Sequence, residues 1–425
     1  MHIPSYTLRS TLIILPSASE VCISSHSMFA NADVLGNIAS LVDVPSLAYF
    51  ILVDSRCFDA GKRYIWEIVP TAFYVLKLLP FFTLRDGTWS VPMSANPASW
   101  EWSRFDLYAP DIRRMISLSS SSIIGDHDID AKTFLNISYL RPDKFADAPI
   151  FPKLQSLIFR GSGLYTNTGP GNIRYLCTDR LEEAEIHVHN FAMLTYLRNL
   201  LPSVASLTKL TLVGRISASV LQTLGKFSNV KSLTIAAVYS TPEVKRTLSP
   251  LICDFFESFP SHMSPEHLVL RAYVPRMLSF ETLSCVKYLE LEDNSSTILH
   301  VLQAGSFDRV SLKFTEVELI SSFHACFEAL AKWSSRTLQT VTISSRAELK
   351  HDFPALHCLN PLLEVPNLQE LCVLHSDKLN IILGDEDLSR IAAAWPSLRR
   401  LNLLPSPLST AYRDVRQQCE PKICP

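Results

Sequence analysis

The stretch Val286-Lys287-Tyr288-Leu289-Glu290-Leu291 decides the fold of this chain. Apolar side chains occupy its first, fourth and sixth places, and its last four residues alternate between outward and inward types. This alternation predicts a β-strand with one buried face. The same spacing recurs at Leu154/Leu157/Phe159, Leu181/Ala184/Ile186, Leu207/Leu210/Leu212, Val230/Leu233/Ile235, Phe307/Val310/Leu312, Leu338/Val341/Ile343, Leu368/Leu371/Val373 and Leu398/Leu401/Leu403, with a degenerate copy at Pro265/Leu268/Leu270.

Copies that recur at intervals of roughly 20 to 35 residues are typical of a repeat solenoid, and this spacing is a leucine-rich-repeat pattern. One copy cannot fold alone, because three buried aliphatic side chains supply about 5–9 kcal/mol. Ordering about twenty residues costs roughly 20–40 kcal/mol. The copies must therefore stack. We expect an α/β horseshoe with parallel strands on its concave face and helical connectors outside, over residues 111–405.

Composition narrows the class of protein. The chain has 425 residues, 47% of them hydrophobic and 19% charged, and a formal net charge of −2. It therefore lacks the excess of basic residues that is typical of proteins that bind nucleic acid. Ten cysteines are scattered singly without a Cys-x-x-Cys pair, which is typical of a reduced cytoplasmic or nuclear protein. The apolar run 69–84 contains Pro70, Lys77 and Pro80 and is too short and broken to span a membrane.

Residues 34–66 have a helical pattern with short breaks. Val34, Leu35, Ile38 and Leu41 recur at steps of three and four, and Pro45 follows a break and can begin the next helix. Three short helices with large apolar faces bury too little surface to be stable unaided. Such a segment needs a partner or a neighbouring domain.

This segment resembles an F-box. The resemblance rests on Leu35-x-x-Ile38, Leu41-Val42, Pro45-x-Leu47, Leu52-Val53 with Arg56-x-Phe58, and Ile65-Trp66. The opening Leu-Pro of that family is absent near Asn31-Ala32, and Asp54-Ser55 departs from its usual Cys-Arg.

Two later segments are similar to fungal F-box proteins. Residues 100–114 resemble the segment that joins F-box to repeats, and residues 387–401 resemble the terminal repeats. The resemblance covers roughly residues 31–404. Together with the residue patterns, it predicts a disordered or non-native leader at 1–30, an F-box-like helical unit at 31–80, a linker at 81–110, the solenoid at 111–405 and an irregular tail at 406–425.

The resemblance implies a substrate-recognition subunit of a cullin–RING ubiquitin ligase, without catalytic residues of its own. Such a subunit acts by holding a target protein near a charged ubiquitin-transfer enzyme. The alternative is a leucine-rich-repeat scaffold whose degenerate F-box no longer binds the adaptor. The residues that the resemblance assigns to the Skp adaptor are Leu35, Ile38, Leu41, Pro45, Leu47, Leu52, Phe58 and Trp66.

Other candidate sites have simpler explanations. The glycine-rich segment 161–171 lacks the Lys-Ser/Thr or helix start of a phosphate-binding loop, so we interpret it as an inserted loop. Glu183, Glu185 and His187 would share one strand face, but without a second cluster a solvated face is the better interpretation than a metal site. We expect no metal, no cofactor and no catalytic constellation.

The concave face is the expected site for the target protein. Residues two and four places after each first apolar position point away from the core, and aligned strands make them a continuous wall. Acidic and basic side chains on neighbouring copies suit a partner of mixed charge. The residues chosen on this face are Tyr288, Glu290, Glu292, Arg309, Lys313 and Arg400.

Overall fold

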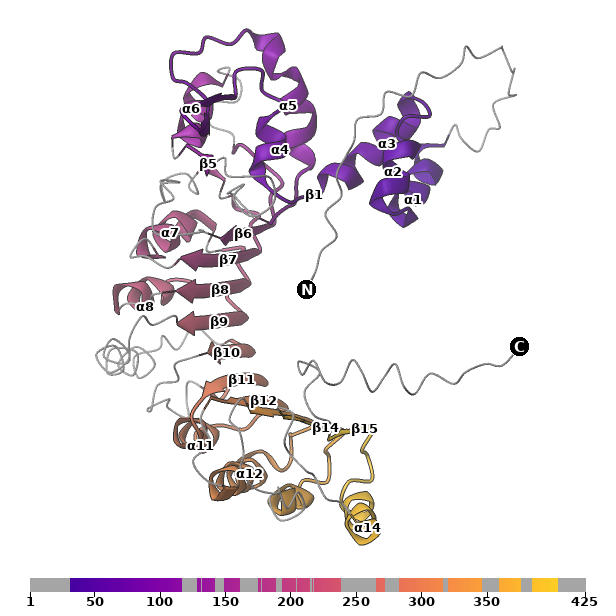
Figure 1. Ribbon diagram of the computed structural model, residues 1–425, viewed down its shortest axis with the longest axis vertical. Helices are drawn as coiled ribbons and strands as arrows, with labels where there is room; N and C mark the ends of the chain where they lie inside the picture. The colour runs from indigo at the N-terminus through magenta and orange to yellow at the C-terminus, as the bar shows by residue number, and fades with distance from the viewer. Residues whose placement is uncertain are drawn as a thin grey trace. The chain divides into compact units, whose positions relative to one another are not determined.

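The chain divides into two compact units, one up to Ile65 and one from Trp66 onward. The expected leader 1–30, the loop 161–171 and the tail 406–425 lie outside the described residues. The computed structural model (Figure 1) describes residues 31–116, 128–130, 132–141, 149–160, 175–176, 178–188, 193–203, 205–214, 216, 218–237, 265–271, 283–315, 320–345, 359–375 and 384–403.

Three helices make up the described part of the first unit: α1 (Ala32–Leu41), α2 (Val44–Phe50) and α3 (Ser55–Trp66), whose last residue falls in the second unit. A side-chain oxygen caps each start. Asn31 accepts a hydrogen bond from the backbone N–H of Asp33, Asp43 from that of Ser46, and Asp54 from that of Cys57. These caps satisfy N–H groups that a first helical turn leaves without partners, so the sequence itself sets where the helices begin.

A small core holds these helices together. Leu35 and Ala39 of α1, Leu47 of α2 and Cys57 of α3 are buried. The helices α2 and α3 approach closely at Gly61, where an added Cβ would lie 2.5 Å from Cγ2 of Ile51. Glycine is therefore needed at this crossing for steric reasons.

The second unit begins earlier than the sequence predicts. Residues 66–80, expected with the F-box-like unit, instead pack in the same apolar core as the strands, because Val69, Phe73 and Leu76 are buried there. Its first elements are β1 (Ile68–Val69), α4 (Ala72–Leu76), β2 (Thr83–Arg85), β3 (Thr88–Ser90), the 3₁₀ helix η2 (Ser99–Trp102), α5 (Ser103–Tyr108), the 3₁₀ helix η3 (Ala109–Asp111), β4 (Arg114–Met115), β5 (Asp128–Ile129) and α6 (Thr133–Leu140).

A three-stranded sheet of order β2-β3-β5 forms part of this N-terminal region. Its hairpin turns at Asp86 and Gly87, which both have positive φ (49° and 78°), as a two-residue turn between twisted strands requires. Residues 81–110, expected to be a linker, therefore contain ordered strands and helices, with Trp102 and Phe105 fully buried.

A sheet of twelve parallel strands runs through the unit in nearly sequential order, β1-β4-β6 and then β7 to β15. This arrangement confirms the α/β solenoid with parallel strands. The remaining strands are β6 (Ser156–Arg160), β7 (Glu183–Val188), β8 (Lys209–Gly214), β9 (Ser232–Ala237), β10 (His267–Arg271), β11 (Tyr288–Asp293), β12 (Arg309–Phe314), β13 (Thr340–Ser345), β14 (Glu370–His375) and β15 (Arg400–Asn402). The connecting helices are α7 (Met193–Leu200), η6 (Leu201–Ser203), α8 (Ala218–Leu224), α11 (Ser295–Leu302), α12 (Ile320–Ser334), η7 (Asn360–Glu364) and α14 (Asp385–Ala394).

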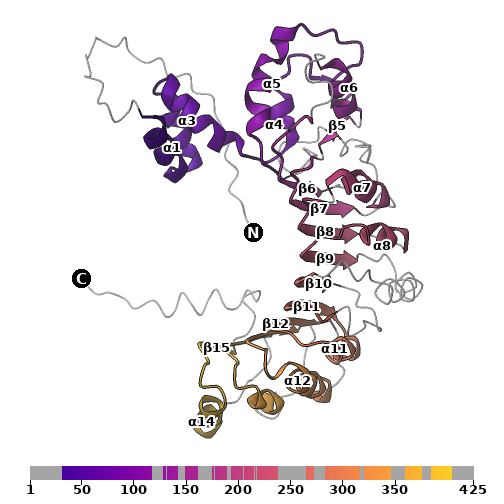
Figure 2. The ribbon, with the colours of Figure 1, turned by 180° about the vertical axis from the view of Figure 1, so that it is seen from behind.

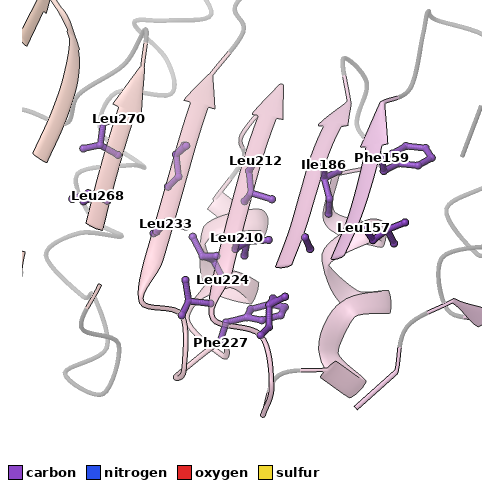
Figure 3. Close-up of a cluster of buried hydrophobic side chains, with 14 of the residues drawn as sticks. Leu157, Phe159, Ile186, Leu210, Leu212, Leu224, Phe227, Leu233, Leu268 and Leu270 are labelled. Carbon is purple, nitrogen blue, oxygen red and sulfur yellow. The ribbon is translucent and has the colours of Figure 1, made fainter. Parts of the chain in front are cut away.

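The strands alternate as the sequence predicts. In β11, Leu289 and Leu291 are buried, whereas Tyr288 and Glu290 are half-buried on the other face. The helices α7, α8, α11 and α12 lie along one side of the sheet in both views (Figures 1 and 2). Side chains from neighbouring strands gather on that side, and Leu224 of α8 and Phe227 join those of Leu210 and Leu233 (Figure 3). Stacking thus covers the apolar face that one copy cannot bury alone.

Polar side chains join successive copies in the turns before the strands. Asn229 donates to the carbonyl of Ala205 at 2.8 Å, and Asn367 donates to that of Arg336 at 3.0 Å. Thr337 donates to Phe307 at 2.8 Å in an equivalent way. Each bond satisfies a carbonyl of the preceding copy and so fixes the spacing between neighbours.

Candidate functional site

The strands present their second face on the side opposite α7, α8, α11 and α12, and we call it the open face. It carries the outward side chains of β6 to β15. One row of register partners crosses it at the start of the strands: Ser156, Glu183, Lys209, Ser232, His267, Tyr288, Arg309, Thr340, Glu370 and Arg400.

A polar network surrounds Tyr288 in the middle of this row. Its ring stacks on that of His267, with centroids 4.2 Å apart and planes inclined by 13°. A ring nitrogen of His267, Nδ1, lies 3.0 Å from the hydroxyl of Ser232, and the hydroxyl of Tyr288 donates to Glu290 at 3.2 Å. Glu290 is bound in turn by Arg271 at 2.8 Å. The network links β9, β10 and β11 and fixes the orientation of one large aromatic side chain.

Burial changes the acid–base properties of this network. It raises the pKa of Tyr288, and the neighbouring carboxylate of Glu290 adds to the rise. It lowers the pKa of His267, against the opposing effect of Glu290. Both effects favour neutral rings, which stack without the cost of burying a charge.

A second set of paired charges lies on β7 and β8. Glu183 accepts hydrogen bonds of 3.1 Å from both Lys209 and Ser156, and His187 contacts Glu185. Burial opposes the negative charge of Glu183, but the hydrogen bonds from Lys209 and Ser156 prevail and lower its pKa. Glu183, Glu185 and His187 share one face as expected, yet the described residues contain no group of three side chains that could hold a metal ion.

The structure brings most of the chosen target-binding residues together. Tyr288, Glu290 and Glu292 on β11 lie beside Arg309 and Lys313 on β12, and Lys313 pairs with Glu292 at 2.8 Å. Arg400 is on β15, three strands from β12 and hence about 14 Å away at the usual strand spacing. Sequence reasoning missed Ser232 on β9 and His267 and Arg271 on β10. Strand β10 reads as a degenerate copy because Val269 is also buried, which hides the alternation.

The residues assigned to the adaptor separate into two groups. Leu41 and Leu52 are 87% and 79% exposed, Pro45 is exposed, and Ile38 and Phe58 are half-buried. Leu35 and Leu47 are each only 1% exposed, in the core of the first unit. Direct contact with a partner was therefore the wrong expectation for these two, because their side chains already pack between the helices.

Trp66, the last residue assigned to the adaptor, is half-buried, so its contact with the adaptor stays a prediction. It falls in the second unit, where its ring stacks on that of Tyr108 with centroids 4.7 Å apart. An aromatic pair of this kind stabilises the packing of its own unit. Trp66 is thus a structural residue of the second unit that remains half-buried.

Three further apolar side chains on the first unit are exposed and were not chosen from the sequence: Val44, Tyr49 and Val53. Together with Leu41 and Leu52 they place five large apolar side chains in solvent within residues 41–53. Apolar side chains that gather on an exposed surface can mark a site where another protein binds. We call these five residues the apolar patch. The sequence of α2 does not reveal the apolar patch, because so short a helix has too few turns for its periodicity to distinguish the buried face from the exposed face.

Comparisons with known proteins give only distant similarity. No family model matches the sequence, and no curated protein matches it. The chain is similar to the crystal structure of the Rad7 and Elc1 complex in yeast, at 14% identity and a TM-score of 0.38, over 84% of this chain and 93% of that chain. It is also similar to the TLR13–ssRNA13 complex, at 14% identity and a TM-score of 0.32, over 70% of this chain and 42% of that chain. Similarity at this level has no bearing on function.

One further feature concerns membranes. Among the helices that the structure describes, none has both the length and the apolar composition needed to cross a bilayer.

Proposed function

We propose that this chain is the substrate-recognition subunit of a cullin–RING ubiquitin ligase. The first unit docks the Skp adaptor, and the open face of the repeats holds a target protein. The chain has no catalytic residues in this proposal and works by bringing the target close to the ubiquitin-transfer enzyme.

The apolar patch is the observation that supports the proposal most. Covering one exposed leucine supplies about 1.5–3 kcal/mol, so even part of this surface can hold a partner. The patch falls within the segment that resembles an F-box, and the helices beneath it are ordered by Leu35 and Leu47. These two residues support the docking surface from below, while Leu41 and Leu52 contact the adaptor.

Affinity purification tests the proposal. We expect the double variant Leu41→Asp/Leu52→Asp to lose the Skp adaptor and cullin, because it brings two carboxylates into an apolar contact. Leu388→Asp, at an equally apolar and exposed residue of α14 in the second unit, is the matched control and should retain both. Adaptor recovery that is the same for all three proteins would contradict adaptor docking through the patch.

The alternative is a repeat scaffold without adaptor, and one observation favours it. Of the residues that the resemblance assigns to the adaptor, Leu35, Leu47 and Trp66 are engaged within the chain itself. In that case purification should recover proteins that depend on Tyr288 of the open face but no adaptor or cullin. The same experiment therefore distinguishes the two functions.

A further inference from the structure

Most charged side chains on strands β7 to β12 of the open face are paired with one another. From β7 to β12 the outward carboxylates have basic partners within the face: Glu183 pairs with Lys209, Glu290 with Arg271 and Glu292 with Lys313. Glu185 contacts His187, which carries a charge only when it is protonated. These charges compensate one another before any partner arrives.

Arg309 is an exception to this pattern. It follows Tyr288 in the row, is exposed, and forms no ion pair or side-chain hydrogen bond with the residues that the structure describes. Its other neighbour in the row is Thr340, which is uncharged. On the adjacent strand Glu292 is already occupied by Lys313, and Glu290 by Arg271. Neither of these two carboxylates on the adjacent strand is therefore left to neutralise Arg309.

The geometry points to a specific partner chemistry: the protein held on the open face presents an acidic side chain, aspartate or glutamate, to Arg309 while an apolar group packs beside Tyr288. This inference rests on the proposed function and adds the chemical class of the bound segment. A guanidinium offers two parallel N–H donors that match a carboxylate. Tyr288, already oriented by His267 and Glu290, supplies contact area at little further cost in side-chain entropy.

A carboxylate suits this site better than a phosphate. Sites that recognise phosphorylated segments use several arginines together. Glu290 and Glu292 lie on the strand next to Arg309. Their carboxylates would repel a phosphate dianion more strongly than a carboxylate monoanion. The surrounding hydroxyl groups of Ser311 and Thr340 can donate to either anion and do not decide between them.

Peptide binding by the full chain tests the inference. The probes are three pools of equal length with the same aromatic and leucine content, in which the charged positions are glutamate, glutamine or lysine, and a fourth pool that carries phosphoserine. We expect the wild-type chain to prefer the glutamate pool, and Arg309→Gln to lose about ten-fold in affinity for it, as expected for one charge-assisted hydrogen bond. Arg309→Glu should shift the preference to the lysine pool.

Two controls separate charge from disruption of the fold. Arg85→Gln replaces an exposed arginine of β2, outside the open face, and should bind like the wild type. Arg104→Gln replaces an exposed arginine of α5, also outside the open face, and should likewise keep the preference for glutamate.

The outcomes distinguish this inference from the proposed function. A wild-type chain that binds no pool, or all pools equally, overturns the inference, and so does a preference for phosphoserine. If Tyr288→Ala loses the cellular partners while Arg309→Glu retains them, the open face binds targets without the acidic contact. If both variants retain every partner other than the adaptor, the open face is not the target site and the proposed function fails in that part.

Discussion

Tyr288 and His267 lie on neighbouring strands as register partners, and their rings stack at 4.2 Å. The contact depends on two residues that are 21 positions apart in the sequence and that meet only because the copies stack in register. It places an ordered aromatic ring in the middle of a polar face. Aromatic side chains of this kind often supply most of the affinity of an interface.

The register of the strands predicts a difference between adjacent residues. Leu289→Ala removes a fully buried side chain and should lower the free energy of unfolding by about 2–5 kcal/mol. Tyr288→Ala removes a half-buried side chain from the open face and should lower it by less. Thermal unfolding followed by circular dichroism measures both variants. Equal losses would mean that the strand is shifted by one residue.

The stability of the repeats should depend on pH through His267. Burial lowers its pKa below the ordinary 6.5, against the effect of Glu290 and with that of Lys209. The unfolded chain therefore takes up a proton near that pH while the folded chain does not, so the free energy of unfolding falls as the pH drops below it. The free energy of unfolding stops falling once His267 of the folded chain is also protonated.

Melting temperatures measured from about pH 7.5 down to about pH 5 test this linkage. His267→Gln keeps a polar side chain but cannot be protonated, so its melting temperature should fall less than that of the wild type over the same interval. Parallel curves for the two proteins would show that the folded and unfolded chains protonate His267 equally.

The buried position of Leu47 predicts a change in thiol reactivity. Leu47→Ala leaves a cavity in the small core that also buries Cys57, so this unit should open more often. Labelling with a thiol reagent, followed by peptide mass spectrometry, should show faster modification of Cys57. The exposed Cys285 of the second unit is an internal reference whose rate should stay the same. Unchanged labelling of Cys57 would place Leu47 outside that core.

The sequence predicts the solenoid well because its signal is repeated. Each copy places apolar residues at the same spacing. A departure from the pattern in one copy, such as the apolar Val269 at an outward position of β10, therefore does not hide the sheet. The side-chain pairing on the open face is harder to predict. Arg271 reaches Glu290 from the preceding strand, and this partnership depends on rotamers and on loops of varying length between strands.

The first unit shows a different limit. A family resemblance assigns Leu47 and Leu52 to the same surface, but only the packing of α2 against α3 shows that Leu47 faces inward and Leu52 faces solvent. The boundary at Ile65 was missed for a related reason. Val69 and Phe73 are as apolar as the residues before them, and composition does not show which core they join.

Calorimetric titration of the purified full chain with purified Skp adaptor tests the central claim most directly. The account predicts saturable binding at one adaptor per chain, with a negative heat-capacity change because apolar surface is buried. Leu41→Asp/Leu52→Asp should abolish the binding, and Leu388→Asp should leave it unchanged. Absence of binding by the wild-type chain, or equal binding by the double variant, would contradict the account.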